Sequence, residues 1–240
     1  MKKITFHSHR TYNNSDQENR PAPASSVMPE WYVKADRYDI DDETGERVIY
    51  PDGAKHPTFK ACPALFDFFA AGYVLKTPCN IKFIEQDGHP GVATEVGFQD
   101  FCIPRTSMKQ FPTPEGHHED HFHWSPSWAP GLPDGYSAIY THPINRFDLP
   151  FMTVAGIIDN DKMNTPGLTP FFIKKGFTGV ITAGTPYLQI IPFKREDWEM
   201  DIKLYSSEEI QQRHNDSYNT FRTPDGGVYK KTIWSRKKYK

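Results

Sequence analysis

Short runs of hydrophobic residues recur through the middle of the chain, each bounded by turn residues and rich in β-branched and aromatic side chains. Such runs predict β-strands, and their regular recurrence predicts a sandwich or barrel. The 21 prolines and 16 glycines exclude long helices, since a proline inside a helix costs about 3 kcal/mol. We therefore predict an all-β protein. The expected strands cover Tyr136–Tyr140, Met152–Ile158, Phe171–Lys175, Gly179–Thr182 and Tyr187–Phe193.

Three segments depart from this pattern. Cys62–Gly72 has apolar side chains on all sides, an early proline and a final glycine, which predicts a short buried helix. Ser206–Arg213 opens with an N-cap serine followed by acidic residues, as a surface helix does. Asp41–Glu46 has the composition of a turn, and we expect it to close a hairpin between Trp31–Ile40 and Arg47–Tyr50.

Length and charge narrow the class of protein. A chain of 240 residues can form one large domain or two small ones. The formal net charge of −2 argues against a general nucleic-acid clamp. Residues 229–240 nevertheless form a basic tail with six Lys or Arg and no acid, whose charge we expect to serve solubility rather than phosphate binding.

The hydrophobic runs and the N-terminus predict where the protein is located. No apolar run reaches the ~18 residues that a membrane helix needs, and no secretory signal is recognised at the N-terminus. These features predict a protein that is cytoplasmic and has no membrane partner. Cys62, Cys79 and Cys102 are an odd number of widely spaced cysteines, which predicts reduced thiols rather than disulfides or a zinc site.

A histidine-rich segment, His117–His123, is the first candidate for chemistry. His118 and Asp120 match the first half of the two-histidine, one-carboxylate triad of non-haem iron oxygenases, with His214 and Arg222 as candidates for the second half. Prolines flank the segment, however, so a solvated loop without a metal is the favoured interpretation, and we assign no metal ligand.

Two further candidates lie on the predicted strands. Asp159 and Asp161 follow an apolar strand, where a desolvated carboxylate can act as a general base. Asp159-Asn160-Asp161 is also an ordinary turn sequence. Gln189 interrupts an apolar strand, so its amide needs partners from the backbone, from another subunit or from a ligand. Taken singly, the turn and the backbone-bonded glutamine are the favoured interpretations.

The order and spacing of four segments resemble the dUTPase family. Gly156–Asp161 resembles its Gly-Val-Ile-Asp-x-Asp-Tyr motif, and Gly184–Gln189 has the spacing of its Gly-Asp-Arg-Ile-Ala-Gln motif. Ala71–Leu75 is similar to its Ala-Gly-Tyr-Asp-Leu, and Pro133–Ile139 to its Pro-x-Gly-Tyr strand. The matches cover about half of the chain, from Ala71 to Phe193. They imply the β-clip fold that dUTPases share with dCTP deaminases.

The resemblance also implies an activity. Asp159 would activate the water that attacks the α-phosphate of a nucleotide, with Asp161 beside it in the same motif. Gly184, Gln189, Asn145 and Arg146 would lie at the nucleotide and its phosphates. The resemblance further implies Mg²⁺ held by the phosphates and active sites formed between the subunits of a homo-oligomer, with a trimer favoured.

Several positions depart from the family pattern. Val74 replaces an acid in the opening motif, and Lys162 stands where a tyrosine follows the second acid. His142–Arg146 replaces the Arg-Ser-Ser phosphate segment and keeps an arginine without the paired hydroxyls. Losing several such contacts, each worth about 1.5–3 kcal/mol, should cripple nucleotide turnover. The sequence therefore favours a non-catalytic binding or assembly protein over a divergent nucleotide pyrophosphohydrolase, with the oxygenase third.

The chain as a whole also resembles a family seen in tailed marine phages, for which the cytoplasm would be that of the infected host cell. Residues that carry this resemblance include Cys62-Pro63, Gly135–Ser137, Pro192–Glu196 with Trp198, and Tyr229–Lys231 with Trp234. Along the chain we expect an N-terminal arm and hairpin over 1–58, a β-clip core over 59–198, and a helix with a basic tail over 199–240.

Overall fold

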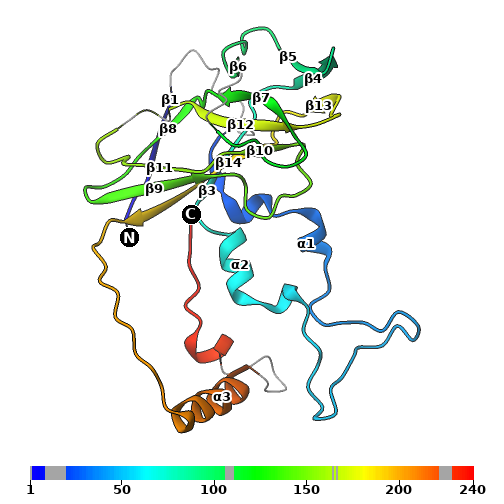
Figure 1. Cartoon of the computed structure of the whole chain (residues 1–240), viewed down its shortest axis with the longest axis vertical. Coiled ribbons are helices and arrows are strands. Elements are labelled where there is room, and N and C mark those ends of the chain that lie inside the picture. The colour runs from blue at the N-terminus through cyan, green and yellow to red at the C-terminus, as the bar shows by residue number, and fades with distance from the viewer. Residues whose placement is uncertain (1, 9–19, 106–110, 164, 166, 222–228) are drawn as a thin grey trace. The chain divides into compact units, whose positions relative to one another are not determined.

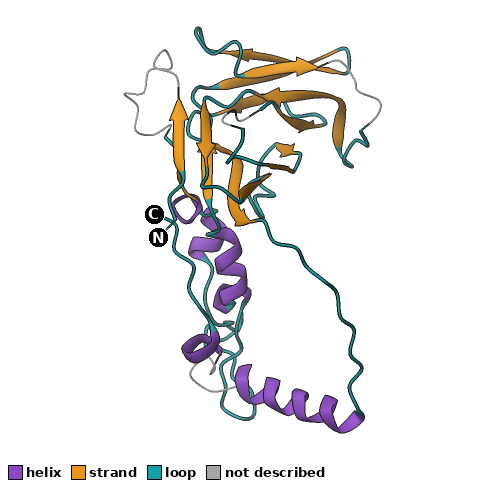
Figure 2. Ribbon diagram, turned by 90° about the vertical axis from the view of Figure 1, so that its left-hand side faces the viewer, coloured by secondary structure: helices purple, strands orange, loops and turns teal. Residues whose placement is uncertain are grey.

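The computed structural model describes residues 2–8, 20–105, 111–163, 165, 167–221 and 229–240. Contacts divide the chain into two compact units. The first holds residues 1–27, 71–195 and Tyr239, and the second holds 28–70, 196–238 and Lys240. Within these described residues, every strand belongs to the first unit and every α-helix to the second (Figures 1 and 2). The two units therefore alternate along the chain.

The first unit is built from antiparallel strands, as the run pattern predicts. In the described residues they form sheets of four, five, three and two strands, in the orders β10-β12-β7-β6, β11-β9-β14-β3-β2, β13-β4-β5 and β1-β8. The bounds are β1 Thr5–Ser8, β2 Ala22–Pro23, β3 Tyr73–Lys76, β4 Ile81–Gln86, β5 His89–Thr94, β6 Cys102–Arg105, β7 His117–Trp124, β8 Trp128–Gly131, β9 Tyr136–Thr141, β10 Phe151–Thr153, β11 Gly156–Ile158, β12 Thr169–Lys174, β13 Gly179–Ile181 and β14 Pro186–Lys194. The protein is thus mostly β, while the β-clip arrangement stays a prediction.

Four of the five expected strands are present as single strands, and the fifth is divided. The run Met152–Ile158 breaks at Val154, whose N–H donates to the carbonyl of Pro170. Its first half, β10, joins the four-stranded sheet, and its second half, β11, joins the five-stranded sheet. The break matters because β11, at the edge of the larger sheet, carries the acidic pair at its end.

An aromatic core joins the sheets. Trp124 of β7 stacks on Phe171 of β12 with ring centroids 3.6 Å apart, and its indole N–H donates to the hydroxyl of Thr153. Tyr187 of β14 packs against the same tryptophan at 5.0 Å. Phe83 of β4 meets Phe122 of β7 edge to face at 5.2 Å, which ties in the three-stranded sheet. The four- and five-stranded sheets therefore share one core.

One glycine is required by this packing. Gly72 has φ +70°, and a Cβ there would lie 2.0 Å from the carbonyl oxygen of Ile190. A larger residue would clash with β14 as well as adopt a strained backbone. Gly72 thus allows β3 to pair closely with β14.

The second unit contains α1 Glu30–Lys34, α2 Pro63–Phe69 and α3 Ser207–Phe221, with shorter turns at Phe59–Ala61 and Tyr229–Ile233. The capping box of α3 is present, since the hydroxyl of Ser206 accepts from Glu209 N and the carboxylate of Glu209 accepts from Ser206 N. In α2 the proline start is confirmed, but burial is not. Of its residues only Phe69 is buried, and Phe68 is 56% exposed.

One other expectation for this unit needs correction. Residues 30–34 are helical, so the first hairpin strand does not extend from Trp31, but the turn at Asp41–Glu46 is present and Ile40 bridges Arg47 as the hairpin requires. The basic tail also makes contacts within this unit. The indole of Trp234 and the ammonium of Lys237 both donate to Asp67 Oδ2, each at 2.8 Å.

Three further observations concern the whole chain. All three cysteines are free thiols, as the spacing predicts. None of the described helices combines the length and apolar character that crossing a bilayer requires. Of the expected N-terminal arm, residues 9–19 lie outside the described part of the chain, whereas Ala22–Pro23 forms β2, which pairs with β3, and Ala24–Val27 forms a 3-10 turn.

Candidate functional site

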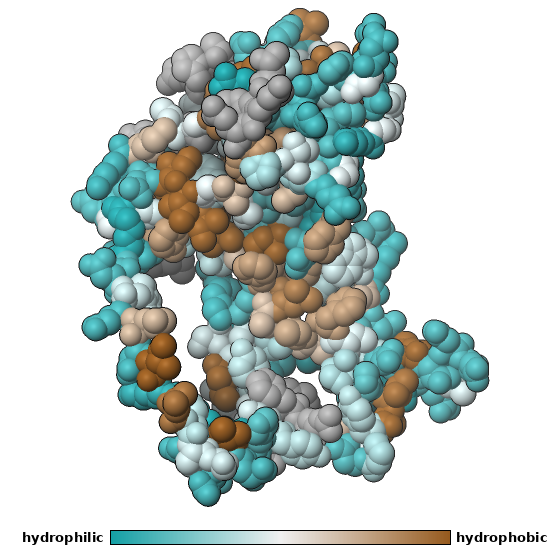
Figure 3. Space-filling view, viewed as in Figure 1, coloured by the Kyte–Doolittle hydropathy of each residue, from teal (hydrophilic) through white to brown (hydrophobic). Residues whose placement is uncertain are grey.

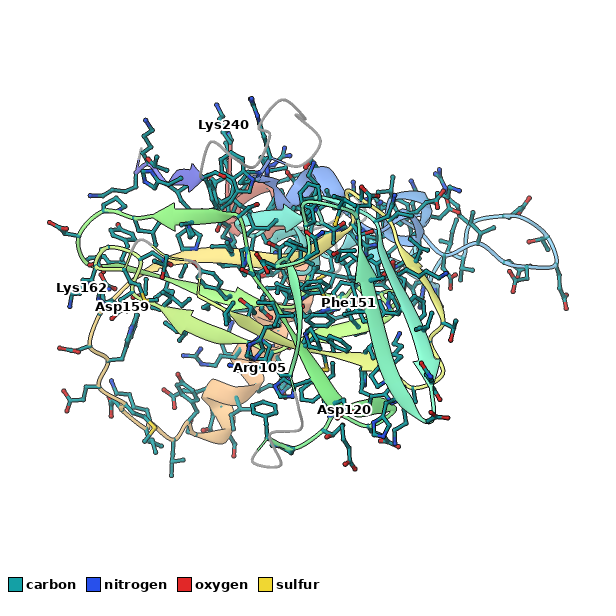
Figure 4. The ribbon with its side chains drawn as sticks, turned by 90° about the horizontal axis from the view of Figure 1, so that it is seen from above. Arg105, Asp120, Phe151, Asp159, Lys162 and Lys240 are labelled. Atoms are coloured by element: carbon teal, nitrogen blue, oxygen red, sulfur yellow. The ribbon has the colours of Figure 1, made fainter. Side chains whose placement is uncertain are left out.

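Asp159 follows the last residue of β11. Because Ile158 pairs with Ala138, Asp159 lies opposite Ser137 of β9, and the Ser137 hydroxyl donates to Asp159 Oδ1 at 2.6 Å. Its side chain is 50% exposed. In Figure 4, Asp159 and Lys162 lie together near one edge of the molecule, away from Arg105 and Asp120. The strand end thus presents one half-exposed carboxylate.

Arg195 joins this carboxylate to Asp161. Its Nη1 lies 3.3 Å from Asp159 Oδ1 and donates to Asp161 Oδ1 at 2.9 Å, and its Nη2 donates to Asp161 Oδ2. The backbone N–H of Gly135 also donates to Asp161 Oδ2, at 2.9 Å. The Arg195 guanidinium lowers the pKa of the Asp161 carboxyl to about 2. Asp161, with a side chain only 4% exposed, is therefore a permanent counter-ion to Arg195.

Gln189 is buried in β14, and both ends of its amide are bound to the backbone. Its Oε1 accepts from Ile144 N at 2.9 Å, and its Nε2 donates to the carbonyl of Ala71 at 2.7 Å. The next residue in the held loop, Asn145, has φ +56°. Arg146 forms a fork with Asp148, whose carboxylate accepts from Nε and Nη2, each at 2.8 Å. The glutamine thus fixes the loop that carries Asn145 and Arg146.

The two groups of candidate residues occupy different ends of β9. Asp159 lies opposite Ser137, and Gln189 pairs with Thr141. Four residues of strand separate these positions by about 13 Å. Gly184 lies apart from both, in a turn where its N–H donates to the carbonyl of Thr77. One chain therefore brings Asp159 to Asp161, and Gln189 to Asn145 and Arg146, but does not join these groups.

Asp159, Asp161, Arg195 and Ser137 form one cluster of contacts at the end of β11, which we call the acidic cluster. The sequence analysis named its two acids but missed Arg195 and Ser137. Arg195 directly follows β14 and Ser137 lies in β9, so both are near Asp159 only because β11, β9 and β14 are neighbours. A lone arginine after a strand is the only signal in the sequence. It becomes informative once the order of the strands is known.

The histidine segment is a strand, so the interpretation as a solvated loop is wrong. β7 is an inner strand of the four-stranded sheet, and its side chains alternate between two faces. On one face His118 contacts Glu85 at 3.1 Å, and Asp120 contacts His89 at 2.6 Å. The core residues Phe122 and Trp124 continue this face. The polar residues at its edge are thus paired with β4 and β5.

The other face of β7 carries His121 and His123, both buried, with ring centroids 5.4 Å apart. Within the described residues, no three His, Cys, Asp or Glu side chains are grouped as metal ligands would be. His214 is exposed on α3, and Arg222 lies outside the described residues. The described geometry therefore assigns no ligand set to the proposed oxygenase.

Burial fixes the protonation of His123. Arg105 Nε donates to its Nδ1 at 3.2 Å, so the proton of the neutral ring lies on Nε2, which is buried and has no partner among the described residues. Desolvation, then the charge of Arg105 and then His121, lower the pKa of His123 to about 4. The fold therefore holds this histidine neutral.

We expect this histidine to make the fold sensitive to acid. Its pKa is about 4 in the fold and near 6.5 in the unfolded chain, so the stabilisation is complete above pH 6.5 and is lost as the pH falls toward 4. In His123→Gln the free energy of unfolding should fall less steeply over this range. Part of the slope should remain, because burial also lowers the pKa of His121. Urea titrations at several pH values measure both slopes, and equal slopes would contradict the assignment.

Comparison with known proteins returned no relatives. No protein-family model matches the chain, and neither a curated protein nor a solved structure matches it. The resemblances to dUTPases and to a phage family therefore stay predictions.

Proposed function

We propose that this protein works by non-covalent binding and assembly rather than by catalysis. The observation that carries the proposal is the engagement of both strand-end acids by one cation. Asp159 accepts from the Ser137 hydroxyl and faces Arg195, while Asp161 is bound by the same guanidinium. A general base must receive the proton of an attacking water, and Asp159 Oδ1 is already occupied by the Ser137 hydroxyl and faces Arg195.

The groups expected at the phosphates are engaged in the same way. Arg146 is held in a fork by Asp148, which has its own carboxyl pKa lowered by that arginine. Both polar atoms of the Gln189 amide are hydrogen-bonded to the backbone. Charge-assisted contacts to a phosphate would have to replace these internal bonds, so their gain in free energy would be small.

A divergent, Mg²⁺-dependent nucleotide pyrophosphohydrolase is the second candidate. It is favoured by the half exposure of Asp159, which leaves one carboxylate oxygen accessible to a Mg²⁺–nucleotide complex. In a β-clip homotrimer, a neighbouring subunit could complete a site that one chain does not form. The β-clip fold and the trimer are both part of this second proposal, the hydrolase.

The two candidates are separated by incubating the full chain with Mg²⁺ and a panel of deoxynucleoside triphosphates. We expect pyrophosphate release to stay at the background of the buffer. Asp159→Asn removes the candidate base, and Asp100→Asn is the matched control at an exposed acid. Release that disappears in Asp159→Asn but persists in Asp100→Asn would replace the binding proposal with the hydrolase.

A further inference from the structure

The segment that follows β14 has the pattern of a strand but belongs to no sheet. Between residues 197 and 204, apolar and charged side chains alternate with period two, as they do on a strand with one buried face. The apolar members are almost fully exposed. They are Trp198 at 88%, Met200 at 82%, Ile202 at 74% and Leu204 at 94%. We call residues 198–204 the arm.

The backbone of the arm is also unpaired. The structure assigns it no helix or strand, and none of its backbone groups forms a backbone hydrogen bond within the described residues. Figure 3 shows hydrophobic side chains exposed along the chain leading to α3. An extended segment with free N–H and C=O groups and one apolar face is a template for pairing with a sheet edge.

The chain is held in place three residues before the arm begins. The N–H of Arg195 donates to the carbonyl of Gly135 at 2.9 Å, which continues the pairing of β14 with β9 by one residue. Its side chain is held by Asp159, Asp161 and the carbonyl of Tyr136. The acidic cluster thus anchors the point from which the chain leaves the sheet.

A sheet edge of matching character is present in the first unit. β11 is the terminal strand of the five-stranded sheet, and its Ile157 is 65% exposed. Ile157 pairs with Ile139 of β9, which pairs with Ile191 of β14, so the three side chains form one apolar row across the sheet. Figure 3 shows hydrophobic residues gathered on this part of the first unit.

The arm is too tightly tethered to pair along its full length with β11 of its own chain. The free edge of β11 lies three strand spacings from β14, or about 14 Å. The three residues from Arg195 to Trp198 span about 11 Å at most. The neighbours of β14 in its own sheet are already β9 and β3. A second copy of the chain has no such limit.

The size of the arm also favours a second copy. A stable interface uses about 20–30 residues on each side, whereas the arm has seven. Reciprocal exchange, in which each copy gives one arm and receives one, multiplies the buried surface and closes the assembly by symmetry. A one-way partner would gain only a single arm.

From these observations we infer that the arm of each chain docks as an added strand on β11 of a second copy, where its apolar side chains extend the Ile157–Ile139–Ile191 row by one strand. This inference rests on the proposed function and specifies the partner. It assigns Arg195, with Asp159 and Asp161, the role of setting the direction in which the arm leaves the sheet.

Analytical ultracentrifugation of the full chain and three variants tests the inference. Met200→Asp/Ile202→Asp places charges on the apolar face of the arm, Ile157→Asp places one on the receiving edge, and Glu199→Gln is the control on the polar face. All four positions are exposed, so the fold should be retained and is checked by circular dichroism. The first two variants should weaken self-association about 30-fold or more, and the control should leave it unchanged.

Mixing the two defective variants provides the decisive result. A mixed pair keeps one intact arm–edge contact, whereas wild type has two and each variant alone has none, so the mixture should associate more tightly than either variant and more weakly than wild type. A wild-type chain that is monomeric at micromolar concentrations, or an arm variant that associates like wild type, would overturn the inference. Either result leaves the nucleotide assay to decide the proposed function separately.

Discussion

Phe171→Ala is expected to lower the free energy of unfolding by about 3–5 kcal/mol. Phe171 is fully buried, stacks on Trp124 and lies 5.5 Å from the ring of Phe122. Its removal would leave a cavity among rigid aromatic rings, which cannot collapse to fill it. Urea unfolding followed by circular dichroism at a fixed protein concentration measures the loss.

Phe147→Ala is the matched control, because the same substitution is made at a side chain that is 78% exposed. We expect it to change the free energy of unfolding by no more than about 0.5 kcal/mol. Equal effects of the two substitutions would mean that the stacked rings of β7 and β12 are not the centre of the core.

Gln189→Leu is expected to destabilise the fold by about 2–4 kcal/mol, because it leaves the N–H of Ile144 and the carbonyl of Ala71 without their partner. The leucine itself fits an apolar strand, so the cost comes from two unpaired backbone groups rather than from volume. Thermal and urea unfolding of the variant measure the effect.

Gln211→Leu on the exposed face of α3 makes the same chemical change at a glutamine whose amide donates only to the neighbouring Asn215. It should leave stability nearly unchanged. A stable Gln189→Leu protein would instead indicate that the buried amide is not a structural clasp. The loop at Asn145 would then have to be held by other contacts.

The positions of several strands could be predicted from the sequence, but which strands pair with one another could not. Period-two and β-branched runs located β9, β12, β13 and β14, since these patterns are local. The break at Val154 was not visible, because the two halves of the run pair with different strands, β10 with the later β12 and β11 with β9. β7 was missed for a different reason. Its histidines lie in a proline-flanked segment with the composition of a loop, and the pairing that makes them strand residues is with β6 and β12, far from them along the chain.

The candidate site was predicted in part. Placing Asp159 and Asp161 at the end of an apolar strand requires only the local pattern, and the structure has them there. Their cation could not be predicted, because Arg195 comes 34 residues after Asp161 and approaches it through the pairing of other strands. The backbone partners of Gln189 were foreseen as a class, but Ile144 and Ala71 could not be named without the register.

The alternation of the two units along the chain has a consequence for biosynthesis. The helical unit contains residues 28–70, made early, and 196–238, made late, with most of the β unit between them. During synthesis on the ribosome, residues 28–70 stay incompletely folded while the 125 residues 71–195 of the β unit are made. Neither body corresponds to a continuous stretch of coding sequence, so no single truncation can isolate one of them intact.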